Sequence, residues 1–279
     1  MEFTGERITT EIFEYWTLEH LHRYALTFNY IKDKKVVDIA SGEGYGSFLM
    51  STLAKEVLGI DISSETVDHA HKKYTNSNLS FKIGSAIKIP VEAKSIDVVV
   101  SFETIEHHSQ HEEMMQEIKR ILKPDGILII SSPDKKYYSD LPGYNNPFHV
   151  KELYFEDFKS LLNKYFINSH FYFQKSIICS TISDHNSKSY DFFEGNYQSI
   201  NSLEHPEEEL YNIAISTDST LSPIKNSFFY NDMIFANIID MAKDYNFYKT
   251  SYYKQKQTLD KIKKNFLYQV LSNFKRFLR

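Results

Sequence analysis

Three glycines and one aspartate have the types and the spacing that could bind a nucleotide-like ligand. Gly42, Gly44 and Gly46 fall within five residues of a chain that has only nine glycines. They follow an apolar, β-branched run at residues 34–40, which predicts a buried strand, and they precede the apolar positions of a helix. Glycine at this turn lets the backbone approach a ligand, and the helix start offers free N–H groups. Asp61 ends the next strand, 19 residues after Gly42, where a carboxylate can accept both hydroxyls of a ribose.

The elements that must position these residues alternate between apolar strands and amphipathic helices. The expected strands are residues 34–40, 56–61, 79–84, 95–102, 127–133, 166–173 and 209–217, and the expected helices include 65–73, 112–122 and 154–165. This order favours an α/β fold around a mostly parallel sheet. The interval 174–208 is too long for a hairpin turn, so we expect an insertion there, with a further candidate strand at residues 176–183.

Composition limits the classes of function. The chain has 279 residues, of which 42% are hydrophobic and 25% charged, as in soluble globular proteins. It has no apolar run that would span a membrane, and its first residues do not resemble a signal peptide, so we expect a cytoplasmic protein. One cysteine, Cys179, excludes an internal disulfide and a thiolate zinc site. The net charge of −5 disfavours nucleic acid as a partner.

The details of the glycine turn identify a family. The turn lacks the G-x-G-x-x-G spacing of dinucleotide-binding proteins. Instead, Asp38 lies four residues before Gly42, and Gly44 lies two residues after Gly42. This Asp-x-x-x-Gly-x-Gly pattern resembles the class I S-adenosylmethionine-dependent methyltransferases. Three later segments also resemble that family: SAIKIP at 85–90, ETIEHH at 103–108 and LKPDG at 122–126. The resemblance implies a Rossmann-like sheet of seven strands, mostly parallel with an antiparallel last strand, and helices on both faces.

The resemblance also implies a cofactor, S-adenosylmethionine, and places residues around it. Gly42 and Gly44 pass close to its methionine part, and the Ala40 carbonyl lies near its ammonium group. Asp61 holds the ribose, and Ile62 packs on the adenine.

Further residues complete the implied cofactor site. Ser85 and Ala86 flank the adenine edge, although the family usually has Asp where this chain has Ser85. Phe102 and Glu103 lie beside the sulfonium end. Two plainer interpretations stay open: Asp38 only braces the glycine turn, and Ile62 and Phe102 are ordinary core residues.

The N-terminal segment resembles a narrower group within this family. Residues 3–9 and 19–26 resemble the leader of bacterial methyltransferases that occur with surface-polysaccharide enzymes. The resemblance implies a helical lid in which Arg23 pairs with the carboxylate of the cofactor. The alternative is an amphipathic helix that packs on the sheet. We expect a lid at residues 1–33, a methyltransferase domain at 34–220 with an insertion at about 174–208, and a helical, basic extension at 221–279.

Histidines are the candidate bases. His149 lies in NPFHVKE, which again resembles the polysaccharide subgroup, and its imidazole could take the proton of an attacking hydroxyl. The alternative is that His149 anchors the next helix; His107 and His108 are second candidates. Glu103, Asp134 and His149 could converge on a metal, but no dense carboxylate cluster requires one, and we expect no obligatory metal.

The sequence therefore predicts an O-methyltransferase that acts on a sugar hydroxyl, with a nucleotide sugar or a capsule or O-antigen-type glycan as acceptor. Two alternatives remain: an N- or C-methyltransferase of a small metabolite, and a non-catalytic scaffold that keeps the cofactor pocket for other glycan enzymes.

The C-terminal tail carries a separate signal. Residues 249–279 have a charge of +8, against −13 for the other 248 residues. Apolar residues recur there at helical spacing: Leu259, Ile262, Phe266, Val270, Phe274 and Phe277. We expect a helix that docks a second copy or a glycan-enzyme partner, with contact to an anionic membrane at its inner face as the second interpretation. Packing on its own domain stays open as an equal alternative, because most amphipathic helices pack in this way.

Overall fold

A computed structural model describes residues 9–11, 15–177, 179–182, 190–205, 209–229, 245, 247–261 and 263–264 of the chain. The chain divides into two compact units, Met1–Phe229 and Tyr230–Arg279. The first contains all the elements that position the candidate site.

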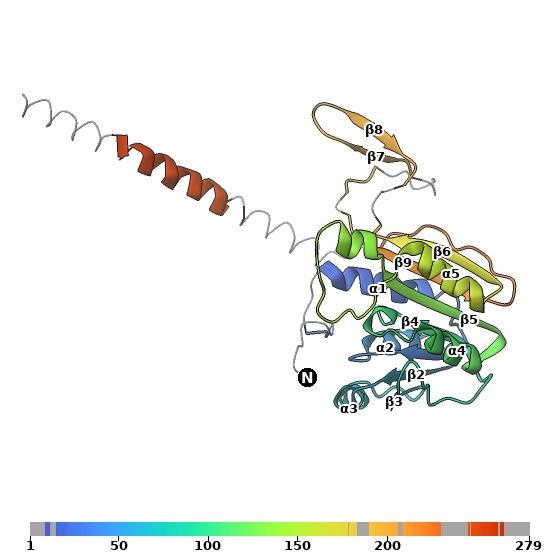
Figure 1. The fold of residues 1–279 in the computed structure, drawn as a ribbon. Coiled ribbons are helices and arrows are strands. Elements are labelled where there is room, and N and C mark those ends of the chain that lie inside the picture. Colours follow the sequence, from blue (N-terminus) through green and yellow to red (C-terminus); the bar gives the residue numbers. More distant parts are fainter. Residues whose placement is uncertain are drawn as a thin grey trace, which may run out of the picture. The chain divides into compact units, whose positions relative to one another are not determined.

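A seven-stranded sheet forms the centre of the first unit (Figure 1). Its strands, in spatial order, are β3 (Leu79–Ile83), β2 (Glu56–Asp61), β1 (Lys35–Ile39), β4 (Ile96–Ser101), β5 (Leu122–Pro133), β9 (Tyr211–Thr217) and β6 (Asn168–Gln174). The pairs among β1 to β5 are parallel, and β9 runs antiparallel to both of its neighbours. The predicted fold class is confirmed.

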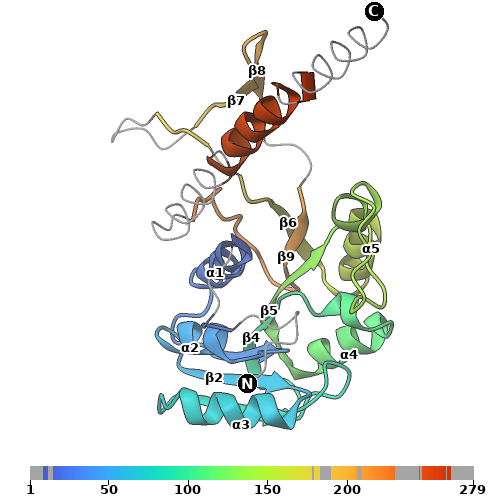
Figure 2. The ribbon, with the colours of Figure 1, turned by 90° about the vertical axis from the view of Figure 1, so that its left-hand side faces the viewer.

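Both faces of the sheet are buried at its centre because β1, β4 and β5 carry apolar residues at consecutive positions. On one face, Val37, Val99 and Leu128 pack against α4 (His111–Ile121) and α5 (Phe155–Tyr165). On the other, Val36, Val98 and Ile129 pack with residues of α1 (Tyr15–Thr27) and α2 (Tyr45–Ser51). Figure 2 shows these two pairs of helices on opposite sides of the sheet.

Local signals explain where the helices begin. α3 (Ser64–Lys73) starts after Ser63, whose side chain accepts the N–H of Thr66, as an N-cap should. α4 buries an apolar stripe at steps of three and four residues: Met114, Met115, Ile118 and Ile121. β5 begins at Leu122, earlier than the predicted residue 127, and a register shift between Ile96 and Val98 accommodates the extra residues.

The insertion differs from the prediction. The candidate strand at 176–183 is wrong for the part that the structure describes, where residues 176, 177 and 179–182 have no regular structure. A two-stranded antiparallel hairpin follows instead, formed by β7 (Phe192–Gly195) and β8 (Ile200–Leu203). Tyr197 lies in its turn and is fully exposed.

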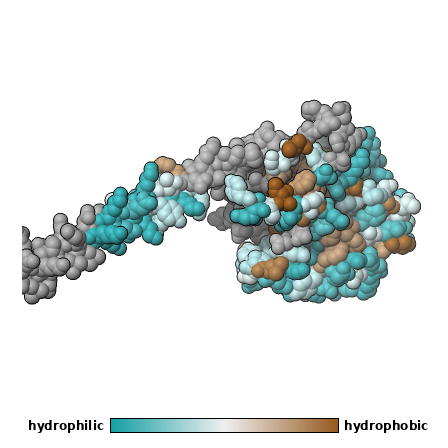
Figure 3. All heavy atoms as spheres, turned by 90° about the horizontal axis from the view of Figure 1, so that it is seen from above, coloured by the Kyte–Doolittle hydropathy of each residue, from teal (hydrophilic) through white to brown (hydrophobic). Residues whose placement is uncertain are grey.

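In the second unit, residues 247–261 are helical. The described part of this helix is mainly hydrophilic in the view of Figure 3. Leu259, 53% exposed, is the one member of the predicted apolar stripe that falls among the described residues; the other five lie outside them. Across the described residues, no helix has the length and apolarity needed to cross a bilayer.

Candidate functional site

The carboxyl ends of β1, β2, β4 and β5 lie at one edge of the sheet, because these strands are parallel. Open α/β sheets bind ligands at this edge. The glycine turn, the Asp61 region, the segment 102–108 and the loop 134–153 all follow these strands.

The glycine turn leaves β1 through backbone conformations with positive φ. Ala40 has φ 58°, Gly42 has φ 54°, and Gly44, the residue before α2, has φ 95°. A Cβ at Gly42 would meet no atom within 4 Å, so this backbone is open to a ligand. A Cβ at Gly44 would lie 2.8 Å from the ring of Phe81, so glycine is needed there for packing as well as for φ.

Asp61 connects the glycine turn with the turn that follows β2. Its Oδ2 accepts the N–H of Gly42 at 3.0 Å, and its Oδ1 accepts the N–H of Ser63 at 2.9 Å. The residue is buried, which holds its carboxylate in one orientation at the end of β2. Ile62, directly after it, is 75% exposed and therefore presents an apolar surface rather than core packing.

Asp38 points into the protein. It accepts a hydrogen bond from the Ser47 hydroxyl at 2.6 Å and a longer one, 3.5 Å, from Tyr24. Burial, with a smaller contribution from the nearby Asp61, raises the pKa of Asp38 to about 7. These contacts favour the bracing interpretation, because Asp38 links β1 to the start of α2.

Arg23 of α1 is buried beneath the same edge. Its Nε donates to Gln174 Oε1 at 2.7 Å, its Nη1 lies 3.4 Å from Glu103 Oε1, and its guanidinium carbon lies 4.3 Å from the centre of the Tyr211 ring. Burial works against its charge, but Glu103, Tyr211 and Glu19 raise the pKa of Arg23 overall. Nη1 and Nη2 have no hydrogen-bond partner among the described residues.

The end of β4 places two predicted residues differently. Phe102 is 7% exposed and meets the Tyr24 ring edge-on, so it belongs to the core. Glu103 has φ 48°, and its side chain accepts the hydroxyl of Ser131 at 2.6 Å beside Arg23. The predicted sulfonium-side pair therefore divides into one packing residue and one polar residue at the site.

Ser85 and Ala86 follow β3 in a tight turn. The carbonyl of Ser85 accepts the N–H of Lys88 at 3.0 Å, and its hydroxyl is 3.4 Å from the Ile87 nitrogen. Both residues are half-buried at the same edge as Asp61.

The structure brings together two of the three candidate bases. The ring centres of His107 and His149 are 5.1 Å apart. His149 Nδ1 lies 2.5 Å from Glu152 Oε1, and its Nε2 lies 3.0 Å from the side-chain nitrogen of Asn146. Glu106, almost fully buried, lies beside them, with Oε1 3.9 Å from His107 Nε2.

The His108 side chain lies against His111 and apart from His149. Its ring lies 5.6 Å from that of His111, and both of its ring nitrogens lack a hydrogen-bond partner among the described residues. Burial and the neighbouring His111 and His107 lower the pKa of His108. It is not part of the cluster around His149.

Sequence reasoning missed Glu106, Glu152 and Glu43. Glu152 follows His149 by three residues, a spacing that could have suggested their pairing. Glu43, between the two turn glycines, is buried and accepts hydrogen bonds from Lys73, Tyr74 and Thr10, which ties the N-terminal segment to the glycine turn.

The residues at this edge fit S-adenosylmethionine. A buried guanidinium whose Nη2 has no partner among the described residues, and whose Nη1 meets only Glu103 at 3.4 Å, suits a carboxylate. An anchored aspartate suits a ribose, and the exposed Ile62 suits a flat base. Arg23, Asp61 and Ile62 would hold these three parts, and the open backbone of Gly42 lies next to Asp61.

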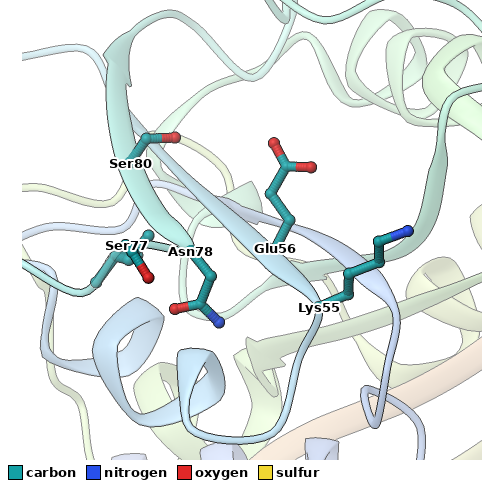
Figure 4. A pocket seen from close by; sticks show the side chains of 6 residues that line it. Lys55, Glu56, Ser77, Asn78 and Ser80 are labelled. Carbon is teal, nitrogen blue, oxygen red and sulfur yellow. The ribbon is translucent and has the colours of Figure 1, made fainter.

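A separate pocket lies at the opposite edge, by the amino ends of β2 and β3 (Figure 4). The residues that line it are polar except for Leu79, and they are Lys55, Glu56, Ser77, Asn78, Leu79 and Ser80. It shares no residue with the site at the carboxyl edge.

Comparisons with known proteins show the family of the chain. Residues 31–265 match the profile of the family described as "Methyltransferase domain". The chain is 32% identical over 167 residues to a probable S-adenosylmethionine-dependent methyltransferase of Mycolicibacterium smegmatis, which covers 58% of this chain and 63% of that protein. It is 30% identical to a probable enzyme of the same description from Mycobacterium tuberculosis, over 58% of this chain and 60% of that one. The chain thus spans about three fifths of these relatives.

Among solved structures, the YcgJ protein of Bacillus subtilis superposes with a TM-score of 0.53 at 16% identity. The superposition covers 72% of this chain and all of that one. At this identity the likeness concerns the fold.

Proposed function

Because this chain belongs to the methyltransferase domain family, we propose that it transfers the methyl group of S-adenosylmethionine to an oxygen of its acceptor. The acceptor we propose is a sugar hydroxyl, in a nucleotide sugar or in a capsule or O-antigen-type glycan. The cofactor supplies an electrophilic methyl group on a positively charged sulfur.

The pairing of His149 with Glu152 carries the choice of oxygen. A sugar hydroxyl is a weak nucleophile that gains from losing its proton as it attacks, whereas a neutral amine needs no such help. With Nδ1 of His149 only 2.5 Å from the Glu152 carboxylate, the ring proton resides on Nδ1, and Nε2 is the basic nitrogen. Both side chains are about nine-tenths buried, which keeps the pair aligned.

The His149 pair lies close to the cofactor residues. Burial and the negative charge of Glu103 raise the pKa of Glu106 well above the usual range, and the positive charge of Arg23 opposes this shift. Arg23 Nη1 lies 3.4 Å from Glu103 Oε1, and ligand atoms of Glu106 and His149 lie within 4.8 Å of each other. Because Glu103 and Glu106 both follow β4, these contacts support an acceptor site close to the proposed carboxylate site.

Aromatic rings around His149 support a sugar as acceptor. Tyr138 stacks on the His149 ring with centres 5.3 Å apart, and Tyr144 meets Tyr138 edge-on at 5.7 Å. Tyr144 and Phe148 are 51% and 43% exposed in the same loop. Such rings offer an apolar face and, in tyrosine, a polar edge to a polyhydroxylated ring.

The mechanism that follows depends on positioning. Asp61 and Arg23 would hold the two ends of the cofactor, and His149 would accept the proton of the acceptor hydroxyl that is positioned beside the cofactor's methyl group. Glu152 keeps the imidazole oriented and stabilises its positive charge.

The test uses the full chain with isotope-labelled cofactor and a panel of nucleotide sugars, free sugars and amines. Mass spectrometry should find one added methyl group on a sugar product, and NMR should place it on oxygen. His149→Gln should lower turnover by about a hundred-fold without changing cofactor affinity, whereas His170→Gln, on the edge strand β6, should not. Methylation of nitrogen or carbon, or near-normal turnover of His149→Gln, would contradict the proposal.

A further inference from the structure

Three side chains beside the acceptor site form a group that is suited to a metal ion. Glu106 and His107 lie in the short helical turn η1 (Ile105–His107), and His149 comes from the loop after β5. One ligand atom of each lies within 4.8 Å of those of the other two. The trio considered from sequence, Glu103, Asp134 and His149, does not converge in this way. The two carboxylate oxygens of Asp134 accept the N–H of Lys136 and the side-chain N–H of Asn212 instead.

Each imidazole has an outer partner that fixes its orientation. His107 Nδ1 lies 3.1 Å from the backbone carbonyl of Phe148, and His149 Nδ1 lies 2.5 Å from Glu152 Oε1. Both partners are acceptors, so both Nδ1 atoms carry the proton and both Nε2 atoms carry the lone pair. The lone pair of His149 Nε2 accepts the side-chain N–H of Asn146 at 3.0 Å, and a bound ion would replace this hydrogen bond. Metal-binding histidines usually show this arrangement, with the second nitrogen donating to a carboxylate or a carbonyl.

Glu106 provides an independent observation. The residue is only 1% exposed, and its Oε2 is buried without a hydrogen-bond partner among the described residues. A buried carboxylate with one unpartnered oxygen is unfavourable, and an ion bound by this carboxylate, whose other oxygen Oε1 lies 3.9 Å from His107 Nε2, would offset that cost.

We propose that Glu106, His107 and His149 bind one divalent transition-metal ion, with Zn²⁺ as the favoured ion. Two imidazoles and one carboxylate suit Zn²⁺, whereas Mg²⁺ and Ca²⁺ prefer oxygen ligands alone. Three protein ligands leave a coordination position open, as in catalytic zinc sites.

The role of the ion rests on the proposed function, because that function supplies the oxygen for the open position. Coordination lowers the pKa of the acceptor hydroxyl. Its O–H bond then breaks with the proton passing to solvent, the oxygen bonds to the methyl carbon, and the bond from carbon to sulfur breaks to leave S-adenosylhomocysteine. In this form of the site, His149 acts as a ligand instead of as the free base.

The binding test needs no substrate. The 279-residue chain is freed of metal with a chelator and titrated with Co²⁺, whose visible spectrum reports nitrogen ligands, and with Zn²⁺ by calorimetry. We expect one ion per chain and visible bands that Zn²⁺ displaces. Glu106→Gln, which keeps the shape of the side chain, and His107→Ala should weaken binding more than about tenfold, and Glu152→Gln by about 10- to 100-fold. His170→Ala should bind as the wild type does.

Two outcomes would overturn the proposal: no bound ion, or binding that Glu106→Gln and His107→Ala leave unchanged. Turnover measured with and without chelator then separates the two proposals. An ion held by these three residues in a protein that methylates no hydroxyl would preserve the metal site and refute the proposed function. Full turnover in chelator without any bound ion would preserve the proposed function and refute the metal site.

Discussion

Replacing Asp61 by asparagine perturbs the cofactor site at one atom. One carboxylate oxygen becomes an amide nitrogen, and the negative charge is lost. Because the two oxygens of Asp61 already accept the N–H groups of Gly42 and Ser63, the new NH₂ group must face one of these donors. The side chain keeps one acceptor, so we expect the loss of one backbone hydrogen bond and of one hydrogen bond to the ribose.

The size of the effect follows from the charge. A hydrogen bond to an ionised group contributes about 1.5–3 kcal/mol, and the remaining ribose bond loses its charge assistance. We expect the free energy of binding S-adenosylhomocysteine, the stable product, to weaken by about 2–3 kcal/mol, which is a loss of about 30- to 150-fold in affinity.

Isothermal titration calorimetry with S-adenosylhomocysteine measures this loss directly. Asp68→Asn is the matched control, because Asp68 is exposed in the neighbouring helix α3. Circular dichroism should show that both variants remain folded. If Asp61→Asn binds within about threefold of the wild type, Asp61 does not hold the ribose and the placement of the cofactor is wrong.

Three further predictions concern the residues that support the site. The raised pKa of Asp38 means that the folded protein binds a proton on this carboxyl group more tightly than the unfolded chain does. The free energy of unfolding should therefore fall by up to about 1.4 kcal/mol per pH unit as the pH rises towards 7. Melting curves at pH 5 to 8 should show that the Asp38→Asn variant lacks this dependence on pH. Gly46→Ala should destabilise the protein by about 1–3 kcal/mol or more, because its Cβ would lie 1.8 Å from the ring of Tyr24, and the added variant Tyr24→Leu should recover part of the loss in chemical denaturation. Although burial opposes it, hydrogen bonds from Lys73 and its neighbours lower the pKa of Glu43; Glu43→Gln should therefore reduce the melting temperature at pH 7, with a smaller difference from the wild type near pH 4, and equal differences at both pH values would contradict this account.

The central sheet could be predicted because its strands are local signals. Runs such as residues 96–101 are apolar at consecutive positions and are bounded by turn residues, which is the pattern of a strand buried on both faces. The meeting of Gly42 with Asp61 could be predicted too, since adjacent parallel strands end at the same edge.

Other features depend on contacts that are distant in sequence. Glu106 reads as a surface residue, but the loop after β5 folds back so that the N–H groups of Val150 and Lys151 donate to its carbonyl at 2.8 and 3.0 Å and cover it. The β7–β8 hairpin has two four-residue strands with mostly exposed side chains, so the sequence carries little hydrophobic pattern to reveal it.

A crystal structure of the full chain with bound S-adenosylhomocysteine tests the central claim most directly. The account predicts that both ribose hydroxyls contact Asp61, that the carboxylate contacts the guanidinium of Arg23, and that the sulfur faces the cluster of Glu106, His107 and His149. A ligand bound elsewhere, or one whose sulfur faces away from His149, would contradict it.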